Sequence, residues 1–248
     1  MLASRAVAEL RKLIHGWRWR AGYLVGTRVP LDYDEQLRAT ILRVRRNTLS
    51  SAERIAALCD AVAYLEREAI PGALVECGVW KGGSMMAAAL TLKSQNRDLY
   101  LFDTFTGMAE PTEADVPSPY DGYSPHRKWR RKSDGWAAVP AQAVREAMNS
   151  TGYPSERVHL IAGKVEDTLP AQAPAKIALL RLDTDWYEST RHELQTLYPR
   201  LARGGVLIVD DYGHYEGARR AVDEYFVELG ERPLLTRIDY TGRIALKR

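Results

Sequence analysis

The sequence predicts an α/β fold in which a mostly parallel sheet carries helices on both faces. Five short apolar runs, each of the length of a buried strand, follow one another along the chain. Three of the four intervals between them hold a segment long enough for a helical crossover, which is the connection that parallel strands need. The five runs are Ala73–Val75, Leu99–Phe102, Val158–Ile161, Ile177–Leu182 and Val206–Val209.

Helical periodicity precedes the first of these runs. Apolar residues recur at the spacing of an amphipathic helix over Asp34–Val44 and again over Ser50–Arg67. Ser50 and Glu53 form a capping box for the second helix, because the hydroxyl and the carboxylate can satisfy backbone amides of its first turn. Two helices are therefore expected before the sheet begins.

The amino-terminal segment is basic and contains tryptophans, and it predicts a helix from Ala3 to about Trp17. We expect residues 1–47 to form a helical extension. It would pack against a second subunit of a homodimer or cover the mouth of the site. Residues 48–248 are expected to form the main domain.

One interval between strands is too long for an ordinary connection. Residues from about 106 to 140 hold Tyr120, Tyr123, Trp129 and Trp136 among many basic side chains. This stretch predicts an inserted lid that is mobile without a ligand and closes over the site.

Charge and composition exclude several classes of protein. Lys and Arg exceed Asp and Glu by 35 − 32 = 3 among 248 residues, so no nucleic-acid partner is expected. No apolar run approaches the roughly 18 residues of a membrane-spanning helix, and no membrane association is expected. Cys59 and Cys77 match no zinc-site spacing and suit buried reduced thiols, which favours the cytoplasm.

A glycine-rich loop follows the first predicted strand. Gly78 allows a sharp turn close to a ligand, and Gly82, Gly83 and Ser84 open the next helix. A helix start of this kind presents free amides to an anion. The spacing matches neither G-x-G-x-x-G nor the phosphate-binding P-loop, so a tight turn without a ligand stays as the alternative.

An acidic residue ends the second predicted strand. Asp103 lies 19 residues after Ser84, close to the roughly 20-residue offset at which a carboxylate meets ribose hydroxyls in dinucleotide-binding folds. It could equally cap the following turn. Together with the glycine-rich loop it favours a nucleoside-containing cofactor.

Three further acids follow the fourth and fifth strands. Asp183, Asp210 and Asp211 should meet at the carboxyl edge of the sheet, because parallel strands end there together. Three carboxylates so close repel one another unless a cation lies among them, and hard oxygen ligands favour Mg²⁺. The alternative is that these acids, with Asp185, cap the next helices.

The chain resembles the macrocin O-methyltransferase family, which includes macrolide-sugar methyltransferases and the aminocoumarin noviose methyltransferase. The resemblance spans about residues 48–230 and leaves residues 1–35 and 106–140, which would choose the acceptor, largely uncovered. Four motifs carry it: Glu76–Ser84 (ECGVWKGGS), Phe102–Met108 (FDTFTGM), Leu180–Tyr187 (LRLDTDWY) and Asp210–His214 (DDYGH).

The resemblance implies a Rossmann-like class I methyltransferase fold, S-adenosylmethionine, a divalent metal and methylation of a hydroxyl, commonly on a deoxysugar. It implies that Glu76 and the Gly82–Ser84 helix start hold the amino-acid end of the cofactor and that Asp103 holds its ribose. The adenine would lie against the segment after the third strand. In that segment the candidates are Gly163, Val165, Glu166 and Asp167.

The expected activity is Mg²⁺-dependent O-methylation of a sugar hydroxyl on an oligosaccharide or a glycosylated metabolite. Asp183, Asp210 and Asp211 would bind the metal, and Asp183 or Asp185 would accept the proton, with His214 as a further candidate base. A catechol-like phenol is the second acceptor class. A nucleotide-binding protein without catalysis is the non-enzymatic alternative.

Overall fold

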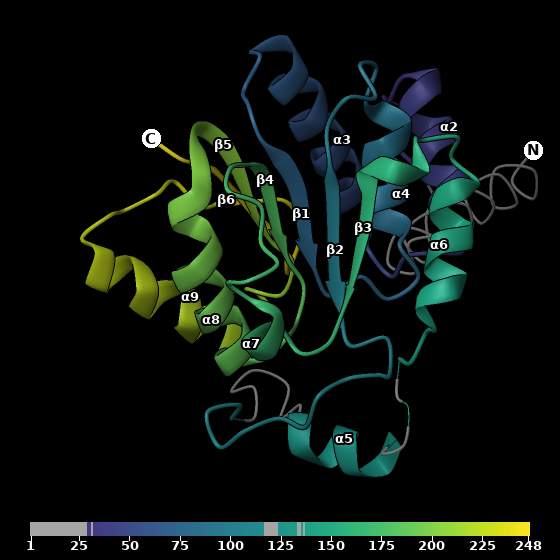
Figure 1. Cartoon of the computed structure of the whole chain (residues 1–248). Coiled ribbons are helices and arrows are strands. Elements are labelled where there is room, and N and C mark those ends of the chain that lie inside the picture. Colours follow the sequence, from purple (N-terminus) through teal and green to yellow (C-terminus); the bar gives the residue numbers. More distant parts are fainter. Residues whose placement is uncertain (1–28, 31, 117–123, 133–134, 136) are drawn as a thin grey trace, which may run out of the picture.

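The computed structural model describes residues 29–30, 32–116, 124–132, 135 and 137–248. The predicted helix Ala3–Trp17 lies outside the described residues. The described chain builds a seven-stranded sheet in the order β3-β2-β1-β4-β5-β7-β6 (Figure 1). The strands are β1 (Ala73–Cys77), β2 (Leu99–Asp103), β3 (Val158–Ala162), β4 (Ile177–Leu182), β5 (Leu201–Val209), β6 (Thr236–Arg237) and β7 (Arg243–Leu246).

The first five strands are parallel, as predicted, and each covers the apolar run expected for it. The strands β6 and β7 were not predicted. They are two and four residues long, and β7 pairs antiparallel with β5 while β6 pairs with β7. Segments this short, with an arginine in each, carry too little apolar periodicity to predict a strand.

Helices cover both faces of the sheet (Figure 1). On one face lie α2 (Glu35–Val44), α3 (Ala52–Arg67), α4 (Gly83–Thr91) and α6 (Ala141–Asn149). On the other lie α7 (Val165–Thr168), α8 (Tyr187–Leu197) and α9 (Glu216–Leu229). Two 3₁₀ turns, η1 (Ser155–Arg157) and η2 (Tyr198–Arg200), precede β3 and β5.

Alternate residues of the strands feed the two cores. Leu74 on β1 packs with α3 and α4, whereas Val75 packs with α8 and α9. This is the pattern of strands that are buried on both faces, and it confirms the α/β expectation.

The predicted capping box is displaced by one residue. Helix α3 is capped by Ser51, whose hydroxyl accepts a hydrogen bond from the Arg54 amide at 3.2 Å, and not by Ser50. The hydroxyl of Ser50 instead accepts a hydrogen bond from the guanidinium of Arg181 at 3.1 Å. Two adjacent serines can both cap a helix, and the tertiary contact with Arg181 decides between them.

Within the described part of the chain, every helix is too short or too polar to cross a membrane. Cys59 and Cys77 are both buried and carry free thiols, as expected.

Candidate active site

The strand order reverses between β1 and β4, where ligands bind in open α/β sheets. The loops after these two strands touch. The Asp183 amide donates to the Cys77 carbonyl at 2.9 Å, and a Cβ added to Gly78 would lie 2.0 Å from the Asp183 carbonyl oxygen. Gly78 also has a φ of +83°. Only glycine therefore lets the two loops meet at this edge.

The glycine-rich loop turns directly into α4. Gly82 caps the helix in the left-handed conformation, with a φ of +81°. The Gly83 amide donates to the Asn47 carbonyl at 3.0 Å, so the loop after α2 is fixed against the helix start. Ser84 is buried in the first turn.

Asp103 organises the same loop through its carboxylate. Its Oδ2 accepts hydrogen bonds from the amides of Val79 at 2.7 Å and Trp80 at 3.0 Å, and its Oδ1 accepts one from Phe105 at 2.7 Å. The carboxylate of Asp103 therefore caps the turn, which is the alternative that the sequence left open. The residue also lines the cavity described next, and an ionised carboxylate can accept about four hydrogen bonds.

A cavity of about 420 Å³, called here the site cavity, opens at this edge. A narrow extension of about 70 Å³ shares five of its lining residues, among them Gly78, Asp103 and Asp183. The predicted residues that line the site cavity are Gly78, Gly83, Ser84, Asp103, Asp183, Asp185, Asp210, Asp211 and His214. Those that line the extension alone are Gly163, Val165 and Glu166.

Three predicted residues do not line either space. Glu76 is buried beneath the glycine-rich loop and bonds to Arg181. Gly82 shapes the helix start, and Asp167 is exposed on α7. The reason is local. Glu76 lies within β1 and not beyond its end, so its side chain projects from the same face of the sheet as that of Leu74.

A cluster of carboxylates lies in the site cavity. Ligand oxygens of Asp183, Asp185 and Asp211 all fall within 4.8 Å of one another. Burial raises the pKa of both Asp183 and Asp211 well above the usual range, and neighbouring carboxylates raise it further. Asp185 adopts a φ of +68°, a strained backbone for a residue other than glycine.

Asp210 takes a different place from the one its sequence position suggests. Its Oδ1 accepts a hydrogen bond from Arg181 at 2.6 Å, and its Oδ2 pairs with Arg54. The close cluster therefore contains Asp185 in addition to Asp183 and Asp211, while Asp210 borders the cavity behind two guanidinium groups.

Arg181 is the centre of this network, and sequence analysis did not single it out. Its side chain is 3 % exposed and contacts Glu76 at 2.5 Å, Asp183 at 2.6 Å and Asp210. It lies inside β4, so one buried guanidinium joins the acids of three neighbouring strand ends. The sequence did offer a signal for Arg181. It is a charged residue within an apolar strand, close to acids that follow the strand ends.

Arg54 is the second residue that sequence analysis missed. It projects from α3 and pairs with Asp210 and, at 3.1 Å, with Asp239 in the turn between β6 and β7. The same Asp239 accepts hydrogen bonds from Ser51 and from the amides of Thr241 and Gly242. Arg54 thereby ties α3 to the loop after β5 and to the last hairpin.

Replacing Glu76 with glutamine is expected to change how stability depends on pH. Burial raises the pKa of Glu76 to about 7, and the opposing effect of Arg181 is smaller. The folded state then keeps a proton that the unfolded state releases near pH 4.5. The stability of the wild type relative to Glu76→Gln is therefore highest below pH 4.5 and falls by about 3 kcal/mol as the pH rises to 7.

Urea unfolding of both proteins between pH 4.5 and 8 measures this difference. The exposed Glu68 is the control, because Glu68→Gln should track the wild type at every pH. A constant difference between wild type and Glu76→Gln across the range would contradict the expectation.

The inserted stretch is partly docked on the domain. The Trp186 indole is 2 % exposed and donates to the Ala109 carbonyl at 2.9 Å, and the Tyr187 amide donates to Asp115 at 2.8 Å. Trp186 thus packs under the insertion. Any closing movement is expected to leave these contacts in place.

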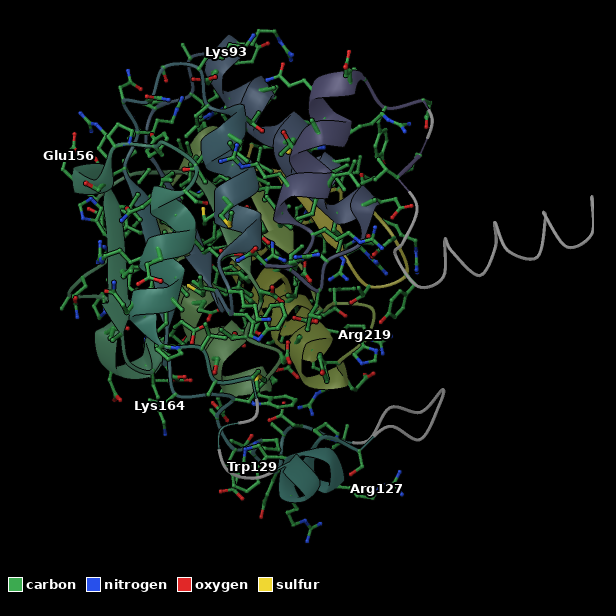
Figure 2. The ribbon with its side chains drawn as sticks, turned by 90° about the vertical axis from the view of Figure 1, so that its right-hand side faces the viewer. Lys93, Arg127, Trp129, Glu156, Lys164 and Arg219 are labelled. Carbon is green, nitrogen blue, oxygen red and sulfur yellow. The ribbon has the colours of Figure 1, made fainter. Side chains whose placement is uncertain are left out.

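The rest of the described insertion forms α5 (Pro125–Lys132), which stands apart from the body of the domain in both views (Figures 1 and 2). Figure 2 marks Trp129 there, and its indole donates to the Met108 carbonyl at 3.4 Å. Met108 also lines the site cavity. Tyr120, Tyr123 and Trp136 lie outside the described residues.

Two side chains of the loop after β5 take different positions. His214 lines the site cavity and lies edge-on to Tyr215 and Tyr240. Tyr212 instead points to α9, where its hydroxyl donates to Asp223 at 2.8 Å.

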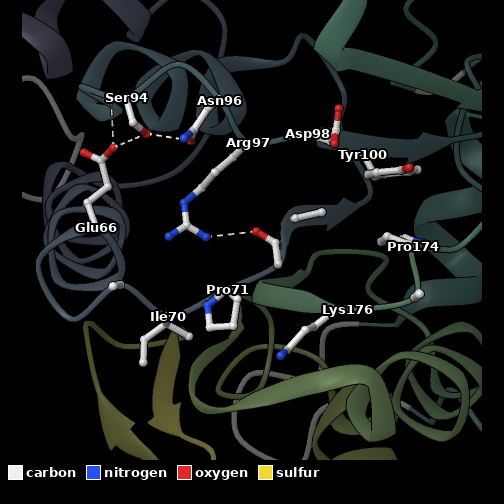
Figure 3. A pocket seen from close by; sticks show the side chains of 14 residues that line it. Glu66, Ile70, Pro71, Ser94, Asn96, Arg97, Asp98, Tyr100, Pro174 and Lys176 are labelled. Carbon is white, nitrogen blue, oxygen red and sulfur yellow. Dashed lines mark hydrogen bonds between the residues drawn. The ribbon is translucent and has the colours of Figure 1, made fainter.

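A separate open cavity of about 600 Å³ lies at the opposite edge of the sheet (Figure 3). It is lined where strands begin, by Ala73 of β1 and by Asp98 and Tyr100 at β2. The Arg97 guanidinium that points into it donates to the Gly72 carbonyl at 2.9 Å. Among the described residues, the group of three acidic side chains that could hold a metal lies at the carboxyl edge and not in this cavity.

The chain is similar in sequence to known proteins. The macrocin-O-methyltransferase (TylF) family matches residues 27–247. The chain is 34% identical over 200 residues to a Streptomyces olivaceus enzyme, 8-demethyl-8-(2,3-dimethoxy-alpha-L-rhamnosyl)-tetracenomycin-C 4'-O-methyltransferase, covering 79% of this chain and 74% of that protein. It is 32% identical, with the same coverage, to demethyldecarbamoylnovobiocin O-methyltransferase of Streptomyces niveus.

Solved structures share the fold of this chain. The O-methyltransferase NovP superposes with a TM-score of 0.71 at 28% identity, covering 92% of this chain and 87% of that one. The Podospora anserina methyltransferase PaMTH1 shares the fold, with a TM-score of 0.56 at 16% identity over 94% of this chain and 96% of that one. The fold is that of the class I O-methyltransferases. The chain therefore belongs to the macrocin-O-methyltransferase family and is an enzyme that transfers a methyl group to oxygen.

Proposed function

We propose that this enzyme methylates a sugar hydroxyl of a glycosylated metabolite, with S-adenosylmethionine as methyl donor and Mg²⁺ as cofactor. The observation that carries the proposal is the meeting of two features in one cavity. A glycine-rich helix start with Asp103 lies on one side of it, and a cluster of three carboxylates lies on the other.

The cavity and its extension suit the donor. Gly78 and Gly163 have φ values of +83° and +139°, and a Cβ at Gly163 would lie 2.9 Å from Thr168, so the backbone at both loops is shaped as only glycine allows. Gly83 and Ser84 would hold the amino-acid end, Asp103 the ribose, and Val165 and Glu166 the adenine. Glu76 would act from beneath the loop. When bound, S-adenosylmethionine supplies an electrophilic methyl group.

The acidic cluster suits a hard divalent cation. All of its donors are carboxylate oxygens, which Mg²⁺ prefers, and Asp211 Oδ2 is buried with no hydrogen-bond partner. Asp183 and Asp211 would hold the ion, and the third carboxylate is Asp185 in this geometry or Asp210 by its position after β5. When bound, Mg²⁺ would orient neighbouring sugar oxygens and lower the pKa of the hydroxyl that is methylated.

The chain's own residues would align the acceptor and take its proton. Methyl transfer is an in-line displacement, so alignment supplies much of the rate. Asp183 contacts the guanidinium of Arg181 at 2.6 Å, so this carboxylate already has a cationic partner, and we assign it to the metal site. Asp185 and His214 line the same cavity and are the stronger candidates for the proton acceptor. Met108 and Trp186 would help to exclude water.

The proposal that the acceptor is a sugar rests on the names of the relatives. Two of them are named for rhamnosyl-tetracenomycin and novobiocin substrates, and a third, from Micromonospora griseorubida, is a mycinamicin III 3''-O-methyltransferase at 30% identity. The particular hydroxyl would be set by residues of this chain that those relatives do not share. A catechol remains the comparison substrate for the assay.

Titration with S-adenosylmethionine in a calorimeter tests the donor. We expect the wild type to bind it and Asp103→Ala to bind about 1–3 kcal/mol more weakly, because a charged hydrogen-bond acceptor is lost. Asp60→Ala, at an exposed position of α3, is the matched control and should bind as the wild type does. An unchanged dissociation constant for Asp103→Ala would show that Asp103 only caps the turn. If the wild type did not bind S-adenosylmethionine, the proposal that this molecule is the methyl donor would be refuted.

The homodimer and the reducing cytoplasm stay predictions. The free thiols of Cys59 and Cys77 support the second of them.

A further inference from the structure

A second cavity adjoins the site cavity and has no part in the chemistry described so far. It measures about 580 Å³ and lies between α2, the start of α3 and the turn between β6 and β7. The two cavities share five lining residues, which form the ridge between them: Thr48, Leu49, Ser50, Arg54 and Tyr240. A ligand longer than the site cavity can therefore continue over this ridge into the second space.

Two large side chains of the ridge are unusually exposed. Leu49 is 80 % exposed and Tyr240 is 63 % exposed, although both border a pocket. The wall of the second cavity also includes the half-buried Ile238 and, at its base, the buried side chains of Ile41 and Ile55. Apolar surface of this kind beside a polar site marks a ligand-binding groove more often than a plain protein surface.

The ridge is held firmly in place. Asp239, next to Tyr240, accepts hydrogen bonds from the Thr241 and Gly242 amides, and Thr241 Oγ1 donates to the Asp210 carbonyl at 2.8 Å. The Tyr240 ring lies edge-on to His214, with centroids 5.9 Å apart. The backbone beside Tyr240 is thus tied to the loop after β5, and the Tyr240 ring packs against His214 of the site cavity.

Charge decides which ligand suits the second cavity. The described residues of its lining include two arginines, Arg45 and Arg54, and two acids, Glu53 and Asp239, so their formal charges cancel. Arg54 is already paired with Asp210 and Asp239. A diphosphate would need an excess of cations, which the described part of this lining does not offer. An uncharged apolar group fits it.

We propose that the second cavity is a binding subsite for the apolar, ring-shaped aglycone of the acceptor, with Leu49 and Tyr240 as the residues that select it. The inference rests on the proposed function, because it takes the sugar to lie in the site cavity. It places the aglycone between α2, α3 and the last hairpin, and it disfavours a nucleoside diphosphate sugar as acceptor.

Calorimetric binding of two glycosides to the full chain, with S-adenosylhomocysteine present, tests the proposal. The probes are methyl α-L-rhamnoside and 4-methylumbelliferyl α-L-rhamnoside, which differ in the aglycone. We expect the aryl glycoside to bind at least about tenfold more tightly. Leu49→Ser and Tyr240→Ala should each weaken binding of the aryl glycoside more than binding of the methyl glycoside, and so remove most of that gain, whereas Tyr240→Phe should keep it.

The control is Leu234→Ser, at an equally exposed leucine (76 %) that lines neither cavity. Equal affinity for the two glycosides, undetectable binding of the aryl glycoside, or the same loss in Leu234→Ser would overturn the proposal. Failure of the proposed function is separate. It would appear as the absence of methyl transfer from S-adenosylmethionine to any glycoside, whatever the aglycone preference in binding.

Discussion

Replacing Arg181 with methionine should lower the free energy of unfolding by about 3–5 kcal/mol, the largest stability effect expected for one side chain of the site. The guanidinium is fully buried and lies between Glu76, Asp183 and Asp210. Its removal leaves these carboxylates to repel one another without a counter-charge, and methionine fills the volume without replacing a hydrogen bond. Chemical denaturation at pH 7.5 measures the loss.

The pH dependence separates charge from packing. The penalty of unpaired carboxylates shrinks when they take up protons, so Arg181→Met should recover part of its stability as the pH falls from 7.5 to 5. Arg67→Met is the matched control, because the ion pair of Arg67 with Glu68 lies on the surface and should contribute less than about 1 kcal/mol. A loss below 1 kcal/mol in Arg181→Met would show that the buried network is not needed for folding.

The position of the site was predictable because parallel strands end together. Gly78, Asp103, Asp183 and Asp211 each follow or end an apolar run, and the sheet brings all four to one cavity. The family resemblance, and not the strand-end rule, added Glu76 to that group, although Glu76 lies within its strand and not after it. The rule fixes where strand ends meet, and it leaves open which way a side chain inside the strand points.

The arginine network was not predictable in this way. Arg54 and Asp210 are 156 residues apart, and Arg181 and Glu76 are 105 apart, so neither pair forms a local pattern. The last hairpin was missed for a related reason. Its strands are short and derive their stability from pairing with β5, a tertiary contact that no periodicity reports. Tyr240 and Asp239 reach the site only through that pairing.

Removal of divalent metal should abolish methyl transfer, and Mg²⁺ should restore it. The cluster of Asp183, Asp185 and Asp211 places three carboxylates within 4.8 Å, a charge density that a divalent cation offsets. We expect excess EDTA, and the variants Asp183→Asn and Asp211→Asn, to lower the rate at least a thousandfold, because the metal is asked to supply several kcal/mol of activation. Full activity in excess EDTA would refute the proposed dependence on a divalent metal.

Binding separates the residues that hold the metal from the residue that takes the proton. Titration of Mn²⁺, followed by its electron paramagnetic resonance signal, reports affinity without turnover. A metal ligand replaced by asparagine should weaken Mn²⁺ binding, whereas replacement of the base should lower the rate and leave that binding unchanged.

Asp185→Asn and Asp210→Asn therefore distinguish the two assignments. In the first, Asp185 completes the metal site and Asp210 serves as the anchor of Arg54 and Arg181. In the second, Asp210 completes the site and Asp185 accepts the proton. Unchanged Mn²⁺ affinity in Asp183→Asn would contradict both, since that carboxylate belongs to the metal site in either case.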